Sequence, residues 1–177
     1  MEQCGFPQYL KTLDREILQR LYEDVLYRDI LSRHGIKEIK SFCQLALWLF
    51  SNTSKNISYP ALSNSLSIKS SISVKNYIGF IQDSYLIFEL YKYDFSLRKQ
   101  YISDKKIYTI DTGLRNAVSF SSTEDIGRLL ENIIFIDLLR KKSEVFYFKN
   151  KYECDFLIKT GSKLKTLIQV AWNLDPS

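Results

Sequence analysis

Cysteine and histidine are scarce in this chain. Its three cysteines, Cys4, Cys43 and Cys154, lie far apart and form no Cys-x-x-Cys pair, and His34 is the single histidine in the sequence. Scattered cysteines in an odd number, without histidine partners, argue against both a disulfide framework and a zinc site. We therefore expect a protein of the reducing cytoplasm.

Long apolar runs are also missing. The longest, at 45–50 and 133–136, are too short to span a bilayer, and the amino terminus lacks the basic-then-apolar order of a signal peptide. We expect no association with a membrane. No Gly-x-x-x-x-Gly-Lys-Ser/Thr loop occurs, so this chain by itself is not expected to hydrolyse ATP.

Hydrophobic residues make up 45% of the 177 residues and charged residues 25%, which suits one ordinary core or two small ones. The net charge is +5, and the segment 41–108 has eight basic against four acidic residues, a local excess of +4. Such a segment favours contact with nucleic-acid phosphates. A solvated basic face without a partner explains it equally well.

Helical patterns dominate the first half of the sequence. Apolar residues recur at helical spacing over 10–32, and Gly35 is placed to end this helix. Ser41 is predicted to cap a second helix, Ser58 a short third one, and Ser73 to open a fourth.

The last of these helices leaves Lys75 and Asn76 on its outer face, and two extended segments, 85–93 and 106–110, follow it. Helices followed by a two-stranded ribbon with a basic link, 94–100, are typical of a winged helix. DNA contact and a purely structural or oligomerising role both remain open. The candidate nucleic-acid-binding residues are Lys69, Lys75, Asn76, Arg98 and Lys99.

The pattern changes after a turn at 111–114. A largely buried helix is predicted over 124–142, and strands over 144–148, 153–159 and 164–172. Glu131 falls in an apolar sector of that helix, where an ionised carboxylate is unfavourable without a partner. With Asp155 and Gln169 on the next strands, its oxygens could converge on a hard divalent cation such as Mg²⁺.

These residues resemble a known family. Gly127-Arg128-Leu129-Leu130-Glu131-Asn132, Tyr152-Glu153-Cys154-Asp155-Phe156 and Ile168-Gln169-Val170 are similar to the C-terminal domain of a large prokaryotic group of AAA-type ATPases. That domain is one of unknown function related to the PD-(D/E)XK nucleases. Gly5-Phe6-Pro7, Tyr27-Arg28-Asp29-Ile30, Tyr85-Leu86-Ile87-Phe88 and Asp111-Thr112-Gly113-Leu114 resemble earlier parts of the same group.

The resemblance implies an α+β chain in three parts. Residues 1–40 would connect to an ATP-binding domain upstream, 41–105 would be a winged helix, and 106–177 a restriction-endonuclease-like mixed α/β domain, truncated because such a sheet needs helices on both faces. ATP would bind only in the upstream domain. The implied partners are double-stranded DNA, the chain's own ATPase domain and a further copy in a homo-oligomer.

The resemblance also places Glu131, Asp155 and Gln169 at the metal-binding positions of a nuclease. Active nucleases have a lysine two residues after the third position, whereas this chain has Ala171, which cannot stabilise the charge of the transition state. We therefore predict a catalytically degenerate domain in which Glu131 and Asp155 bind backbone or basic groups. A metal-dependent DNA nuclease whose lysine comes from elsewhere, such as Lys159, and a structural docking module remain alternatives.

Overall fold

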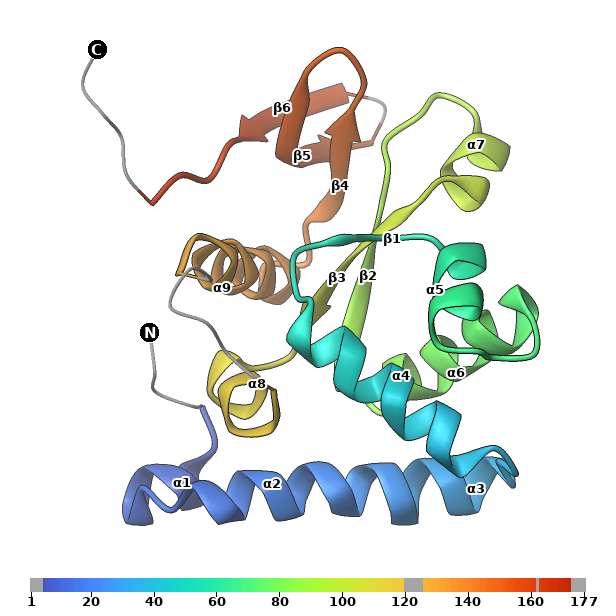
Figure 1. The fold of residues 1–177 in the computed structure, drawn as a ribbon. Coiled ribbons are helices and arrows are strands. Elements are labelled where there is room, and N and C mark those ends of the chain that lie inside the picture. Colours follow the sequence, from blue (N-terminus) through green and yellow to red (C-terminus); the bar gives the residue numbers. More distant parts are fainter. Residues whose placement is uncertain (1–4, 120–125, 162, 173–177) are drawn as a thin grey trace.

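The computed structural model describes residues 5–119, 126–161 and 163–172, which form a mixed α/β fold with two small antiparallel sheets (Figure 1). The helices are α1 (Pro7–Thr12), α2 (Arg15–Asp24), the π-helical η1 (Val25–Leu31), α3 (Ser32–His34), α4 (Ile39–Ser51), α5 (Tyr59–Ser65), α6 (Ser71–Asp83), α7 (Leu97–Ile102), α8 (Thr112–Val118) and α9 (Ile126–Arg140). The strands are β1 (Asn56–Ile57), β2 (Ile87–Tyr91), β3 (Lys105–Thr109), β4 (Glu144–Lys149), β5 (Glu153–Thr160) and β6 (Lys163–Ile168). None of the described helices has the length and apolar character needed to cross a membrane.

A long helix made of α2, η1 and α3 runs along one edge of the molecule (Figure 1). It ends at Gly35, whose φ of 58° is the left-handed conformation that suits glycine. The predicted helical segment is confirmed, but it is interrupted near its start. Leu13 has a φ of 55°, and the Asp14 carboxylate accepts a hydrogen bond from the Glu16 N–H at 2.9 Å to begin the new helix.

The first sheet has the strand order β1-β3-β2. Along the chain, the segment that contains it runs in the order α4, β1, α5, α6, β2, α7 and β3. In Figure 1 its helices α5, α6 and α7 lie on one side of these strands, and α9 lies on the other. Buried side chains of α2 to α6 form the main core with this sheet and α8. On α6 the buried residues are Val74, Ile78 and Ile81, as the helical spacing predicts.

Helix starts differ from the predictions where several serines are close together. Ser58 caps α5 as predicted, but Ser70 rather than Ser73 caps α6, by accepting a hydrogen bond from the Ser73 N–H at 3.1 Å. Ser41 lies inside α4 and does not cap it. The sequence predicts a basic link between two strands at 94–100, whereas the structure has helix α7 beginning at Leu97. A six-residue helix is too short to show a clear period in the sequence.

The second sheet has the order β4-β5-β6 and packs with α9. Its core continues into the first sheet, because Tyr108 of β3 stacks on Phe135 of α9 with ring centroids 4.1 Å apart. The two sheets also meet at their edges, where the Tyr93 N–H donates to the Tyr147 carbonyl oxygen at 2.7 Å. The predicted third strand is confirmed but ends at Ile168, before Gln169.

Candidate functional site

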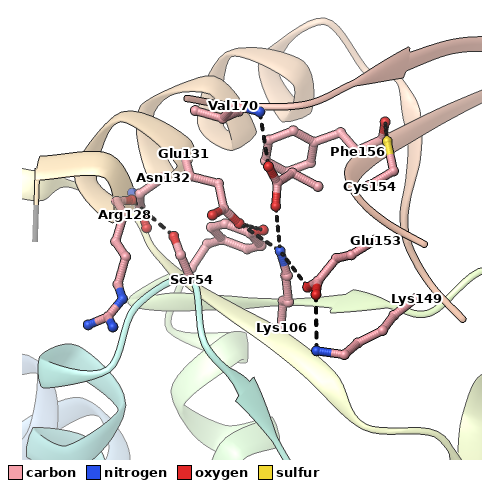
Figure 2. Close-up of polar contacts among 12 residues, drawn as sticks. Ser54, Lys106, Arg128, Glu131, Asn132, Lys149, Glu153, Cys154, Phe156 and Val170 are labelled. Carbon is pink, nitrogen blue, oxygen red and sulfur yellow. Dashed lines mark hydrogen bonds and ion pairs between the residues drawn. The ribbon is translucent and has the colours of Figure 1, made fainter. Parts of the chain in front are cut away.

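A buried cluster of charged side chains lies where β3, α9 and β5 meet (Figure 2). The ammonium Nζ of Lys106 lies 3.1 Å from Glu131 Oε1 and 2.9 Å from Asp155 Oδ1. The exposed fractions of the three side chains are only 5%, 12% and 9%. One lysine therefore bridges the two carboxylates that the sequence predicts to be close together, and we call these three residues the Lys106 cluster.

Two further groups complete this arrangement. The Tyr108 hydroxyl donates a hydrogen bond to Glu131 Oε1 at 2.7 Å, and Asp155 Oδ2 accepts one from the Val170 N–H at 2.9 Å. At the rim, Glu153 Oε1 lies 4.0 Å from Lys106 Nζ. The buried carboxylates thus bind a basic group, a phenol and a backbone amide, which satisfies much of their need for donors.

The cluster has two buried carboxylates for one ammonium group. Burial works to lower the pKa of Lys106, but Glu131 and Asp155 together outweigh it and hold the pKa above its ordinary value. Burial raises the pKa of Glu131, and Lys106 and the Tyr108 hydroxyl offset this only in part because Asp155 adds repulsion. The lysine is thus firmly charged, while burial favours the protonated form of Glu131 more than in an exposed glutamate.

Gln169 does not join this cluster. It follows the end of β6 with an exposed side chain, and its neighbour Val170 makes the contact with Asp155. Within the described residues, no three His, Cys, Asp or Glu side chains form a group that could hold a metal ion. The Lys106 ammonium occupies the space between the carboxylates, so Mg²⁺ does not fit these residues as they are arranged.

Asn132, next to Glu131 on α9, is fully buried and joins three segments. Its Oδ1 accepts hydrogen bonds from the Thr53 hydroxyl at 2.6 Å and the Thr109 N–H at 2.8 Å, and its Nδ2 donates to the Thr109 carbonyl at 2.9 Å. Nearby, the Ser54 hydroxyl donates to the Arg128 carbonyl at 3.0 Å (Figure 2). These bonds hold α9 against β3 and the loop before β1.

The predicted nucleic-acid-binding residues are all exposed, and they lie in or next to α6 and α7. Lys69 precedes α6, Lys75 and Asn76 are on α6, and Arg98 and Lys99 are on α7. A pocket lined by residues of α5, α6 and the end of α7 lies between α6 and α7. By contrast, Lys105 and Lys106, counted in the basic segment, are both only 4% exposed. They contribute little to the charge of the surface.

Sequence reasoning missed the roles of Lys105 and Lys106. Consecutive residues of a strand point to opposite faces, so two adjacent lysines in a buried strand need a separate partner on each side. Lys106 reaches Glu131 and Asp155, whereas Lys105 donates to the carbonyl oxygens of Tyr101 and Ser103 at the end of α7. The available signal was a Lys-Lys pair next to Ile107 and Tyr108 in a short strand.

One protein-family model matches more than half of this chain. The chain belongs to that family, Domain of unknown function (DUF8612), whose model matches residues 3–125. The matched segment ends before α9.

Two relatives extend the comparison over nearly the whole chain. Uncharacterized protein MJ1544 of Methanocaldococcus jannaschii is 35% identical over 97% of this chain and 40% of its own length. An uncharacterized protein of Haemophilus influenzae is 25% identical over 96% of this chain and 44% of its own length. The chain therefore spans about two fifths of the length of these relatives. No solved structure matches it.

Proposed function

We propose that this chain is the C-terminal region of a prokaryotic AAA-type ATP-binding protein, with a DNA-binding winged helix and a catalytically degenerate nuclease-like domain. The expected boundary at residue 105 falls at the first residue of β3, so the proposed winged helix extends from 41 to the end of β3 at Thr109 and the nuclease-like domain follows it. Residues 1–40 would connect to the ATPase domain. The resemblance of the sequence motifs supports this division, and relatives more than twice as long leave room for an ATPase domain.

The strand order of the first sheet carries the proposal. A winged helix consists of a helix, a short strand, two helices and a two-stranded ribbon, with the short strand paired to the last strand. The segment from α4 to β3 has this order, and β1 pairs with β3, which pairs with β2. In that reading, α6 is the recognition helix and α7 forms the wing.

The surface of α6 and α7 supports contact with DNA. Lys75 and Asn76 are exposed on α6, and Arg98 and Lys99 are exposed on α7. Lysine and arginine side chains on a helix that faces solvent can neutralise phosphates and release counterions. Double-stranded DNA is therefore the partner that we propose for this surface.

The Lys106 cluster supports a degenerate nuclease-like domain. An antiparallel meander, β4 to β6, follows α9 as in the nuclease core, but Lys106 forms ion pairs with the carboxylates at the predicted metal positions. Ala171 supplies no charge at the position where active nucleases have lysine. We propose that the cluster is structural and that no cofactor binds in this region.

Fluorescence anisotropy with a labelled DNA duplex, at several salt concentrations, tests the DNA-binding role. We expect the affinity to fall steeply with salt, and Lys75→Ala and Arg98→Ala each to weaken binding and reduce the slope of log K against log salt by about 0.9 per lost phosphate contact. Lys11→Ala, an exposed lysine on α1, is the matched control. Binding that is absent, or weakened equally by Lys11→Ala, would refute the role.

A cleavage assay tests the degenerate role separately. Plasmid DNA incubated with the chain and Mg²⁺ or Mn²⁺ should remain intact. Metal-dependent cleavage that disappears in Glu131→Gln and Asp155→Asn would instead establish the nuclease alternative. Light scattering, which measures molecular mass, would reveal a homo-oligomer if the surface serves assembly.

A further inference from the structure

The segment 95–102, which includes α7, exposes several large apolar side chains. Phe95 is 93% exposed, Leu97 66%, Tyr101 64% and Ile102 73%, all within eight consecutive residues. Two cations, Arg98 and Lys99, lie among them on α7 and are also exposed. Large apolar groups gathered in this way on a surface mark an interaction site rather than random exposure.

Several contacts hold this segment in place. Lys105 Nζ donates hydrogen bonds to the Tyr101 carbonyl and, at 2.6 Å, to the Ser103 carbonyl, and it lies 5.1 Å from the centroid of the Tyr59 ring. The side-chain amide of Gln100 donates a hydrogen bond to the Asp94 carbonyl oxygen at 2.6 Å. A buried lysine thus fixes α7 in an exposed position, so the apolar side chains are arranged before any partner binds.

A pocket of about 370 Å³ lies between α7 and the first turns of α5 and α6. Tyr101 and Ile102 line one side, and Lys75, Ser71 and Tyr59 line the other. The volume is at the lower end of the range of small-ligand sites, roughly 300–1,000 Å³. We call this pocket, together with the exposed side chain of Tyr101, the α6–α7 cleft.

We propose that the α6–α7 cleft binds an unpaired nucleotide, with its base against Tyr101 and its phosphate near Lys75. This inference rests on the proposed DNA-binding function and adds the structure recognised, a duplex with an unpaired end. Base stacking requires an exposed aromatic face, and the phosphate requires a cation and hydroxyl donors, which the cleft supplies together.

The charges favour a nucleic acid over an apolar groove of another protein. Arg98 and Lys99 on α7 and Lys75 in the cleft would all lie beside a phosphate backbone, where they would be neutralised. In a protein groove these cations would need acidic partners or would lose hydration. Asp104, at the edge of the cleft, is exposed and remains solvated.

Anisotropy titrations of the full chain compare a forked duplex with a fully paired duplex of equal phosphate number. We expect the fork to bind more tightly, and Tyr101→Ser to weaken fork binding about tenfold while changing duplex binding little. Tyr101→Phe retains the ring and should bind the fork as the unaltered chain does. Tyr85→Ser is the matched control, since Tyr85 is 70% exposed at the other end of β2.

The results of these titrations distinguish the proposal for the α6–α7 cleft from the DNA-binding function on which it rests. Equal affinity for fork and duplex, unchanged by Tyr101→Ser, would overturn the cleft proposal and leave duplex binding intact. Absence of binding to either DNA would overturn both. Because the Tyr101 side chain is exposed and its carbonyl makes the contact with Lys105, Tyr101→Ser should fold, as urea unfolding can verify.

Discussion

Replacing Lys106 by methionine tests the Lys106 cluster most directly. Methionine keeps much of the length and apolar character of the lysine stem but removes the ammonium group. Glu131 and Asp155, which lie 3.1 and 2.9 Å from that group, would remain buried without a cation. Among the described residues, the Tyr108 hydroxyl and the Val170 N–H would still donate hydrogen bonds to them.

The expected loss of stability is large. Removing one partner of a buried ion pair destabilises a protein by about 3–5 kcal/mol because the other charge remains uncompensated. A typical domain has a free energy of unfolding of about 5–15 kcal/mol, so Lys106→Met removes a large fraction of it. Urea unfolding followed by circular dichroism at pH 7.5 measures the difference.

The effect should depend on pH with a defined sign. The pKa of Glu131 is already raised above 4.5 by burial, and loss of Lys106 raises it further. A folded state that binds this proton more tightly than the unfolded state gains stability as the pH falls from the raised pKa toward 4.5. The difference between Lys106→Met and the unaltered chain should therefore shrink between pH 7.5 and pH 5.

Two further variants test whether the loss of stability comes from the buried charges of the Lys106 cluster. Lys149→Met removes an ion pair at 3.1 Å whose side chains are 50% and 44% exposed, and it should destabilise by less than about 1 kcal/mol. The triple variant Lys106→Met, Glu131→Gln, Asp155→Asn removes all three charges of the Lys106 cluster together and should recover most of the loss. A loss below about 1 kcal/mol in Lys106→Met, or one that does not change with pH, would show that the cluster is not a coupled buried ion pair.

Two further substitutions test other parts of the fold by urea unfolding. Asn132→Leu leaves the Thr109 N–H and carbonyl without their side-chain partner and should destabilise by about 3 kcal/mol; a loss under about 1 kcal/mol would mean that these groups find other partners. Ser70→Ala removes the cap of α6 and should destabilise by about 1 kcal/mol, whereas the exposed Ser65→Ala should have almost no effect. Equal effects of the two serine changes would contradict the assignment of the cap.

Local patterns in the sequence predicted most elements correctly. The helical spacing of α6 and the helix stop at Gly35 depend on residues within a few positions of one another, so they can be read without a structure. The start of α6 was misplaced because Ser70 and Ser73 are equally good caps by residue type. The extended backbone at Ser70 and the hydrogen bond that its hydroxyl accepts from the Ser73 N–H distinguish them.

The candidate site was predictable only in part. A carboxylate in an apolar helix sector indicated that Glu131 needs a partner, and the strand alternation indicated that Asp155 lies near it. Neither pattern identified Lys106, which is 25 residues before Glu131 and 49 before Asp155. Its charge, counted in the sequence as part of a basic surface, is buried.

The sequence by itself determined most of the longer helices and strands and which of their faces are apolar, since these follow from short-range spacing and from the conformations that each residue type prefers. The tertiary structure decided which partners the buried charges have. Contacts between β3, α9 and β5 arise from packing over long separations, where one step along a strand turns a side chain to the opposite face. That single step directs Lys105 to α7 and Lys106 to Glu131 and Asp155.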